Sequence, residues 1–163
     1  MLQRLANYCR DHQDWLIETI EALVALESPT DHKSAVDRCG DELARRLVEI
    51  GGRVTPITTT TAGNHLRAEF SEGPRQVLLL GHFDTVWPVG QLQRMPLARD
   101  GGRLKGPGVL DMKAGIALGM LATRALFALA PPRGVRLVML WTTDEETGSH
   151  SSRALLETEA RQS

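Results

Sequence analysis

Residues 77–87 read VLLLGHFDTVW, an apolar run that ends abruptly in a histidine and an aspartate two positions apart. In an extended segment, residues i and i+2 project from the same face, so His82 and Asp84 can address one point just beyond the end of a strand. A metal-bound imidazole normally donates its second ring nitrogen to a carboxylate or carbonyl, and Asp84 can accept that hydrogen bond. Two interpretations are open at this stage: a metal ligand with its supporting acid, or a loop histidine with an acidic neighbour.

The segments around this motif predict a parallel crossover. Residues 76–80 are apolar on both faces, which is typical of a strand at the centre of a parallel sheet, and residues 135–142 repeat the pattern. A helix predicted at residues 113–129 connects the two strands, and such a unit is almost always right-handed and parallel. Ligands of such sheets gather beyond the carboxyl ends of the strands, so we expect a site there.

Five candidate ligands or bases converge on that edge. His82 and Asp84 follow the first strand, Glu145 and Glu146 follow the second, and Asp111 precedes the crossover helix. Each has a simpler explanation when taken alone: Asp111 as a helix N-cap or first-turn acid, and Glu145 and Glu146 as first-turn acids of a C-terminal helix. Convergence from three separated segments is much harder to obtain by chance, and it favours a functional site.

The rest of the chain predicts helices and strands that support the site without contributing candidate residues to it. Apolar residues at helical spacing indicate one helix that ends at Ser28-Pro29-Thr30 and a second that starts after Asp31 as its N-cap and stops at Gly51-Gly52. Residues 53–59 and 64–70 predict strands. A turn at Asp100-Gly101-Gly102 predicts a hairpin.

Composition argues against several classes of protein. The 163 residues are 42% hydrophobic and 24% charged, which is ordinary for one globular domain. The 19 basic and 20 acidic residues form no long block of either sign, which gives no support for a nucleic-acid partner. Cys9 and Cys39 lie far apart and outside any Cys-x-x-Cys pattern, which favours buried thiols over a disulfide framework or zinc ligands.

Nothing in the sequence predicts export or a membrane partner. The N-terminus mixes charges into every turn and lacks the order of a signal peptide, so we expect a cytoplasmic protein. The most apolar stretch, residues 114–130, is 17 residues long, carries Arg124 and is closed by Pro131-Pro132. It is short for a membrane span and predicts a buried helix.

Three motifs together resemble a known family. GHFDTVWP (81–88), GPGVLDMKAG (106–115) and TTDEETGS (142–149) occur in this order, with 27 residues from Asp84 to Asp111 and 34 from Asp111 to Glu145. They are similar to the motifs of the di-zinc peptidases and deacylases. This family includes the glutamate carboxypeptidases, aminoacylases, acetylornithine deacetylases and succinyl-diaminopimelate desuccinylases. The resemblance is closest to the glutamate carboxypeptidase (carboxypeptidase G) branch, and it covers most of the chain.

The resemblance implies a role for each candidate residue. His82 would bind one zinc ion, Glu146 the other, and Asp111 would bridge the pair. Asp84 would support His82, and Glu145 would be the general base. The cofactor would be two Zn²⁺ ions, with Co²⁺ or Mn²⁺ able to substitute, and the family pattern adds a cis peptide bond between Asp111 and Met112.

The resemblance also implies a fold and a reaction. The fold would be an α/β, three-layer α/β/α sandwich with a mixed, largely parallel central sheet. The reaction would be hydrolysis, through a metal-bridged water, of an amide bond adjacent to a C-terminal amino acid or in an N-acyl amino acid. The partner would therefore be a small peptide or N-acyl amino acid. These expectations agree with the residue types, since imidazole and carboxylate ligands suit zinc.

The sequence departs from the family pattern in one respect. Family members add an acidic ligand after the third motif, a late histidine ligand, and a lid domain through which homodimers form, and residues 1–163 contain none of these. We therefore expect a truncated N-terminal part of the catalytic domain that binds metal weakly and is inactive alone. The alternative is a non-catalytic metal-binding or interaction module of the same fold, although the presence of all five site residues favours the hydrolase.

Overall fold

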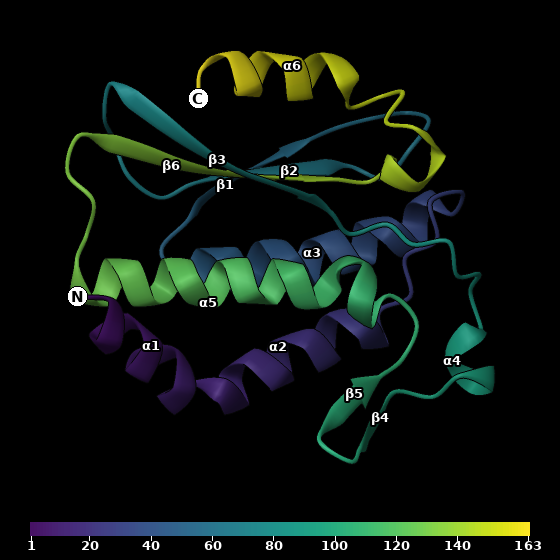
Figure 1. Cartoon of the computed structure of the whole chain (residues 1–163). Helices are drawn as coiled ribbons and strands as arrows, with labels where there is room; N and C mark the ends of the chain where they lie inside the picture. The colour runs from purple at the N-terminus through teal and green to yellow at the C-terminus, as the bar shows by residue number, and fades with distance from the viewer.

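The computed structural model describes all residues, 1–163. The chain begins with three helices followed by three strands, and helices and strands are interspersed after them (Figure 1). In order they are α1 (Leu2–Asp11), α2 (Gln13–Ala25), α3 (Lys33–Glu49), β1 (Arg53–Ile57), β2 (His65–Glu69), β3 (Arg75–His82), α4 (Gln91–Arg94), β4 (Ala98–Asp100), β5 (Arg103–Lys105), the helical turn η1 (Val109–Lys113), α5 (Ala114–Leu129), β6 (Val135–Thr142), the turn η2 (Glu145–Thr147) and α6 (Arg153–Arg161).

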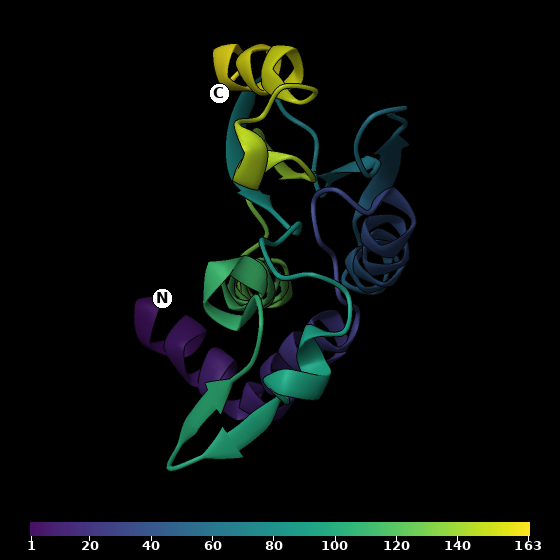
Figure 2. The same cartoon turned by 90° about the vertical axis from the view of Figure 1, so that its right-hand side faces the viewer.

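The elements form three layers. A four-stranded sheet lies between α6 on one face and α3 and α5 on the other, with α1 and α2 packed against α5 from outside (Figures 1 and 2). The small β4–β5 hairpin stands apart from the sheet, at the turn predicted from Asp100-Gly101-Gly102. This arrangement confirms the predicted α/β class and its layered architecture.

The sheet brings together the two strands that carry the site. Its order is β1-β2-β6-β3, with β1–β2 and β2–β6 antiparallel and β3–β6 parallel, so the sheet is mixed. In the parallel pair His82 lies opposite Thr142, which puts the carboxyl ends of both strands at one edge. The predicted crossover and the position of its carboxyl edge are therefore confirmed.

The prediction that β3 is a central strand is wrong. In this chain β3 pairs only with β6 and lies at the edge of the sheet, where Val77 and Leu80 are each 50% exposed. An apolar pattern on both faces of a strand reflects what covers those faces, and it carries no information about which strands pair with its edges. The matching prediction for β6 is correct, since β6 lies between β2 and β3.

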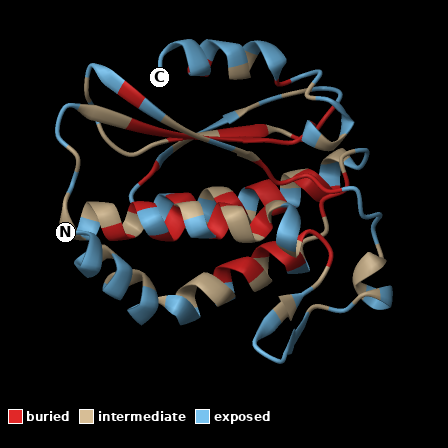
Figure 3. Cartoon of the chain, in the orientation of Figure 1, coloured by how far each residue is buried: buried red, intermediate tan, exposed pale blue.

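The core lies between the sheet and its helical layer. Buried residues gather on the inward sides of α3 and α5 and along β6 (Figure 3). Gly81 lets these layers approach closely at the site, because a Cβ there would lie 2.7 Å from the ring of Trp141 and 3.0 Å from Met112. The largest cluster comprises Leu23, Val36, Cys39, Leu43, Leu47, Leu66, Ala68, Phe83, Ile116, Met120, Met139 and Trp141.

One local expectation needs correction. Helix α3 is capped by His32, whose Nδ1 accepts a hydrogen bond from the Ala35 amide at 3.3 Å, and not by Asp31. The helix predicted at residues 113–129 is confirmed as α5, and η1 does not extend it, because Asp111 and Met112 have non-helical backbone angles. Val109–Leu129 together make a 21-residue apolar stretch that contains an 18-residue window with a mean hydropathy of 1.4. By length and composition alone it could cross a membrane, but in this fold it packs against α1, α2 and the sheet.

Candidate metal centre

Three of the predicted ligands meet at the carboxyl edge of β3 and β6. His82 is the last residue of β3, Asp111 lies in η1 ahead of α5, and Glu146 lies in η2 just beyond β6. One ligand atom from each of these residues lies within 4.8 Å of the others, which is close enough for shared coordination of metal ions. The chain therefore brings an imidazole and two carboxylates from three segments to one point.

Asp84 and Asp111 flank the imidazole of His82. The Nδ1 atom of His82 lies 3.3 Å from a carboxylate oxygen of Asp84 and 3.2 Å from its carbonyl oxygen. The Nε2 atom lies 3.1 Å from Asp111 Oδ1. A hydrogen bond from Nδ1 to Asp84 leaves Nε2 directed at the carboxylate cluster, which is the orientation required of a metal ligand.

Asp84 also joins the segments around the site. It is fully buried, and its Oδ2 accepts hydrogen bonds from the Thr30 hydroxyl at 2.7 Å and from the Glu146 amide at 3.3 Å. One carboxylate thus touches His82, the turn that carries Glu146, and the segment after α2. We infer that Asp84 fixes the geometry of the cluster in addition to orienting one ring.

Ser28 and Thr30 are site residues that sequence reasoning missed. Residues 28–30 look like a helix terminator, but they run beside the segment after β3 and form a parallel bridge between Pro29 and Thr85. The Ser28 hydroxyl donates to the Phe83 carbonyl at 2.6 Å, and the Thr85 amide donates to the Ser28 carbonyl at 2.9 Å. In the sequence, a Ser-Pro-Thr segment that holds the residues after β3 looks the same as one that only ends a helix, so the contacts of Ser28 and Thr30 could not be predicted.

The electrostatics of the cluster favour a bound cation. Burial opposes protonation of His82, but the hydrogen bond and charge of Asp84, together with the charges of Glu145 and Asp111, outweigh it and raise its pKa to about 9. Burial and the nearby charges of Asp111, Asp84 and Glu145 raise the pKa of Glu146 as well. Four carboxylates around one imidazole repel one another unless positive charge is supplied. This donor set fits divalent metal ions.

Glu145 lies beside the converging group of His82, Asp111 and Glu146 without being part of it. Its side chain is 53% exposed, and its Oε2 lies 3.7 Å from His82 Nε2. It therefore stands at the open side of the cluster. The peptide bond between Asp111 and Met112 is cis, as the family resemblance implies, and the Met112 sulfur accepts a hydrogen bond from the His82 amide at 3.4 Å.

Asp144 anchors the turn that carries Glu145 and Glu146. Its Oδ2 accepts hydrogen bonds from the Ser151 amide at 2.6 Å, the Ser151 hydroxyl at 2.8 Å and the Ser152 amide at 3.1 Å. Burial raises the pKa of Asp144, but hydrogen bonds from the side chains and backbone amides of Ser152 and Ser151 outweigh it and lower the pKa below its ordinary value. The sequence shows only an acidic run here, so this role was not predicted.

Lys113 is a second residue whose role was not predicted from the sequence. It is 1% exposed, and its Nζ donates to the carbonyls of Leu23 at 2.9 Å and Leu26 at 2.8 Å, at the C-terminal end of α2. Burial lowers the pKa of this ammonium group. Lys113 thereby ties η1, and with it Asp111, to α2.

One hollow adjoins the cluster, and a larger hollow lies elsewhere in the molecule. A pocket of about 290 Å³ is lined by Glu146 together with Thr30, Asp31, Thr85 and Thr147. A larger hollow of about 420 Å³ lies between α2 and the β4–β5 hairpin and contains none of the site residues. Of these two hollows, only the pocket beside Glu146 is lined by a residue of the converging group.

Comparisons with known proteins agree with this geometry. Carboxypeptidase G2 of Pseudomonas sp. (strain RS-16) is 33% identical over 158 residues, which cover 93% of this chain and 37% of that protein. Succinyl-diaminopimelate desuccinylase 2 of Shewanella loihica is 35% identical over 125 residues, which cover 73% of this chain and 33% of that protein. The chain thus spans about a third of the length of these relatives.

Solved structures share the fold. Human carnosine dipeptidase 1 superposes with a TM-score of 0.81 at 24% identity, over 97% of this chain and 38% of that one. The dipeptidase Dug1p of Saccharomyces cerevisiae gives 0.82 at 18% identity, over 98% of this chain and 38% of that one. Residues 78–163, more than half of the chain and all five site residues, match one family. The chain belongs to peptidase family M20/M25/M40, whose members include metallopeptidases and desuccinylases.

Proposed function

We propose that this site serves the hydrolysis of an amide bond adjacent to a C-terminal amino acid or in an N-acyl amino acid, in the manner of a glutamate carboxypeptidase. The observation that carries the proposal is the convergence of His82, Asp111 and Glu146, with ligand atoms within 4.8 Å of one another. Family membership supports the metal-dependent hydrolase class. The names of the relatives, a carboxypeptidase and two desuccinylases, support a small peptide or acyl amino acid as substrate.

The proposed cofactor is a pair of Zn²⁺ ions: His82 would bind one ion, Glu146 would bind the other, and Asp111 would contribute to both. When bound, the pair supplies positive charge that acidifies a water and stabilises the oxyanion of amide hydrolysis. The residues of the chain orient the imidazole and supply the negative charge that such ions require. Asp84 holds the His82 ring through Nδ1 so that Nε2 faces Asp111, and the excess carboxylate charge draws cations to the site.

Glu145 is proposed as the general base. Its carboxylate stands exposed at the open side of the cluster, within 3.7 Å of His82 Nε2, where it can take a proton from the attacking water and pass it to the leaving amine. Asp84 and Asp144 hold the turn on which it lies: Asp84 accepts from the Glu146 amide, and Asp144 from the amides of Ser151 and Ser152. The turn that carries Glu145 is therefore held by hydrogen bonds, while its carboxylate is open to solvent.

We further propose that residues 1–163 form the N-terminal part of such a catalytic domain. Three ligand residues are few for two zinc ions, which usually take about four ligands each, so we expect weak zinc binding and little turnover from these residues alone. A cytoplasmic location and a homodimer remain predictions.

A zinc titration tests the ligand set. Competition with a chromophoric chelator at neutral pH should show zinc binding, and Asp111→Asn and Glu146→Gln should each weaken it by about tenfold or more. Glu157→Gln, which removes an exposed acid on α6, is the matched control and should bind as the parent chain does. Equal affinity in all four proteins would refute the proposed site.

The role of Glu145 needs a separate test. In a protein extended to the length of its relatives, Glu145→Gln should abolish release of free amine from an N-acyl amino acid while leaving zinc affinity within about twofold, because Glu145 is not a proposed ligand. Retained hydrolysis would remove Glu145 as the base.

A further inference from the structure

One buried histidine outside the metal centre touches both ends of the loop 144–150, which carries two of the site residues. His65 is the first residue of β2 and is 1% exposed. Its Nδ1 lies 2.9 Å from the hydroxyl of Thr143, which directly follows β6. Its Nε2 lies 3.2 Å from the hydroxyl of Ser151, which lies just ahead of α6. One imidazole ring therefore spans the base of the loop.

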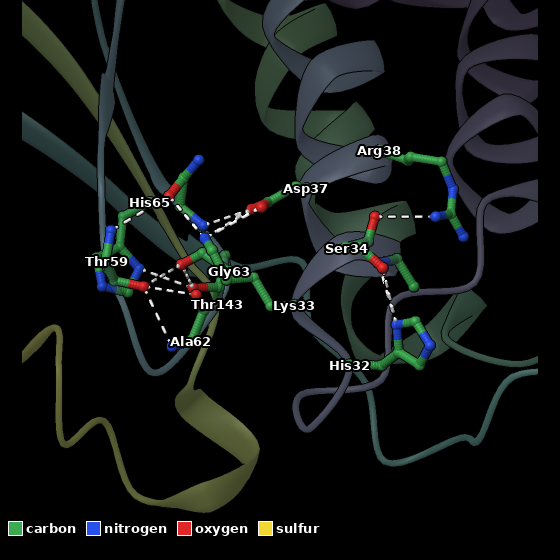
Figure 4. A network of polar contacts seen from close by, with 12 residues as sticks. His32, Lys33, Ser34, Asp37, Arg38, Thr59, Ala62, Gly63, His65 and Thr143 are labelled. Carbon is green, nitrogen blue, oxygen red and sulfur yellow. Dashed lines mark hydrogen bonds and ion pairs between the residues drawn. The ribbon is translucent and has the colours of Figure 1, made fainter.

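The Thr143 hydroxyl determines which nitrogen of His65 carries the proton. A hydroxyl group has one proton, and that of Thr143 is donated to the Gly63 carbonyl at 2.5 Å (Figure 4). A carbonyl oxygen can only accept, so Thr143 has no proton left for His65 and accepts one from Nδ1 instead. His65 is therefore protonated on Nδ1.

The Gly63 carbonyl is held in place by α3. The Asn64 amide donates to Asp37 at 2.7 Å, and the Asn64 side-chain oxygen accepts from Lys33 at 2.9 Å. A Cβ at Gly63 would collide with Val36, so the backbone of this loop lies directly against the helix. The acceptor at the start of this series of hydrogen bonds is thus fixed to the scaffold.

The Ser151 hydroxyl joins His65 to the carboxylate that anchors the loop. Burial lowers the pKa of His65, against the charges of Asp144 and Asp84, so the ring is mostly neutral at pH 7 and its bare Nε2 can only accept. The single hydroxyl proton of Ser151 is shared between this Nε2 at 3.2 Å and Asp144 Oδ2 at 2.8 Å. The amides of Ser151 and Ser152 donate to the same Oδ2. His65 therefore acts on the anchor through Ser151.

We propose that His65 is a positioning residue for the candidate site, because it clamps Thr143 and Ser151 and so closes the loop between them. That loop carries Glu145, the proposed base, and Glu146, a proposed zinc ligand. The ring hydrogen-bonds to none of the proposed ligands and acts only through the two hydroxyl groups. The inference rests on the proposed function, since it explains how the base and the ligand are held at the edge of the sheet.

The first test measures the tautomer in the metal-free chain. Proton–nitrogen correlation spectra of the histidine rings, recorded just above neutral pH, should show His65 with its proton on Nδ1 and a bare Nε2. The His65→Gln variant identifies the signal. A proton on Nε2 with a bare Nδ1 would overturn the inference.

The second test removes the ring. His65→Val keeps a strand-forming residue but loses both contacts. It should speed hydrogen exchange at the Ser151 and Ser152 amides by about three- to tenfold, because their anchor on Asp144 opens more often. It should also weaken zinc binding by about threefold, which is less than the loss of a ligand because the effect passes through the loop.

Conservative variants separate the two ends of the clamp. His65→Asn places an amide near the position of Nδ1 and can still donate to Thr143, whereas His65→Gln places one near Nε2 and can still contact Ser151. Each should recover part of the zinc affinity lost in His65→Val, and His65→Gln should recover more of the exchange protection at Ser151. The matched control is His12→Gln, at a half-buried histidine between α1 and α2, which should change neither.

A further variant distinguishes the clamp from general support of β2. Leu66→Val trims the buried neighbour of His65 in the core and should lower the melting temperature while zinc affinity stays as in the parent chain. Equal loss of zinc affinity in Leu66→Val and His65→Val would overturn the positioning role. If His65→Val does not fold, the tautomer and the His65→Asn and His65→Gln variants carry the test.

The zinc titration described above separates failure of this inference from failure of the proposed function. A chain that binds zinc through Asp111 and Glu146 equally well with and without the His65 ring refutes the clamp alone. A chain in which loss of the ring speeds exchange at Ser151, but which binds no zinc, supports the clamp and refutes the metal centre.

Discussion

Replacement of Asp84 by asparagine should change the protonation of His82 more than any other single substitution at the site. Asp84 is fully buried and is the main contributor that raises the pKa of His82 to about 9 from an ordinary value of 6.5. That difference corresponds to roughly 2–3 kcal/mol of interaction favouring the imidazolium, once screening by solvent is allowed for. Because burial still opposes protonation in Asp84→Asn, we expect the pKa of His82 to fall to near or below 6.5.

The assay is a histidine side-chain NMR titration of the metal-free chain, in which His82→Ala identifies the signal of His82. Asp111→Asn is the matched control. Asp111 Oδ1 lies 3.1 Å from the imidazole, but its side chain is 68% exposed, so the pKa should fall by less. A His82 pKa that stays near 9 in Asp84→Asn would refute the assignment of Asp84 as the group that orients and charges the ring.

The same shift predicts how stability depends on pH. A histidine whose pKa is raised by folding contributes stability that is fully present below its unfolded pKa of about 6.5 and is lost as the pH rises through about 9. The metal-free chain should therefore lose this contribution between these values, and Asp84→Asn should not. Thermal unfolding at pH 6 and pH 9.5 measures the difference.

Three further substitutions test how the site is supported. Lys113→Met removes the ammonium donor from the Leu26 carbonyl and one of the donors to the Leu23 carbonyl, and it should lower the free energy of unfolding by about 1–3 kcal/mol, measured by urea denaturation. Gly81→Ala places a Cβ 2.7 Å from Trp141 and should cost about 1–3 kcal/mol through overpacking; an unchanged melting temperature would contradict the close approach. Ser28→Ala removes the donor to the Phe83 carbonyl and should cost about 1 kcal/mol and weaken zinc binding, whereas a purely helix-terminating role predicts normal zinc affinity.

The sequence predicted what depends on local pattern. Apolar residues at helical spacing located α2 and α3, and the two apolar strands with a helix between them located the β3–α5–β6 crossover. The crossover in turn predicted that the five polar residues lie at the carboxyl edge of the sheet, because the ends of two parallel strands and the start of the helix between them meet only there. Three of them, His82, Asp111 and Glu146, do meet there.

What the sequence could not show depends on contacts between distant segments. The edge position of β3 is a property of strand pairing, which the apolar pattern of one strand does not encode. Thr30 lies 54 residues from Asp84 and looks like part of a helix break. Lys113 looks like a surface residue because lysine is rarely buried, and only its hydrogen bonds to the Leu23 and Leu26 carbonyls at the end of α2 explain its place.

The most direct test of the central claim is a crystal structure of the chain soaked in zinc chloride, with anomalous data collected on both sides of the zinc absorption edge. We predict anomalous peaks bounded by His82 Nε2 and the carboxylates of Asp111 and Glu146. Peaks found only at other sites, with these three side chains free of zinc, would contradict the claim that they form a metal centre.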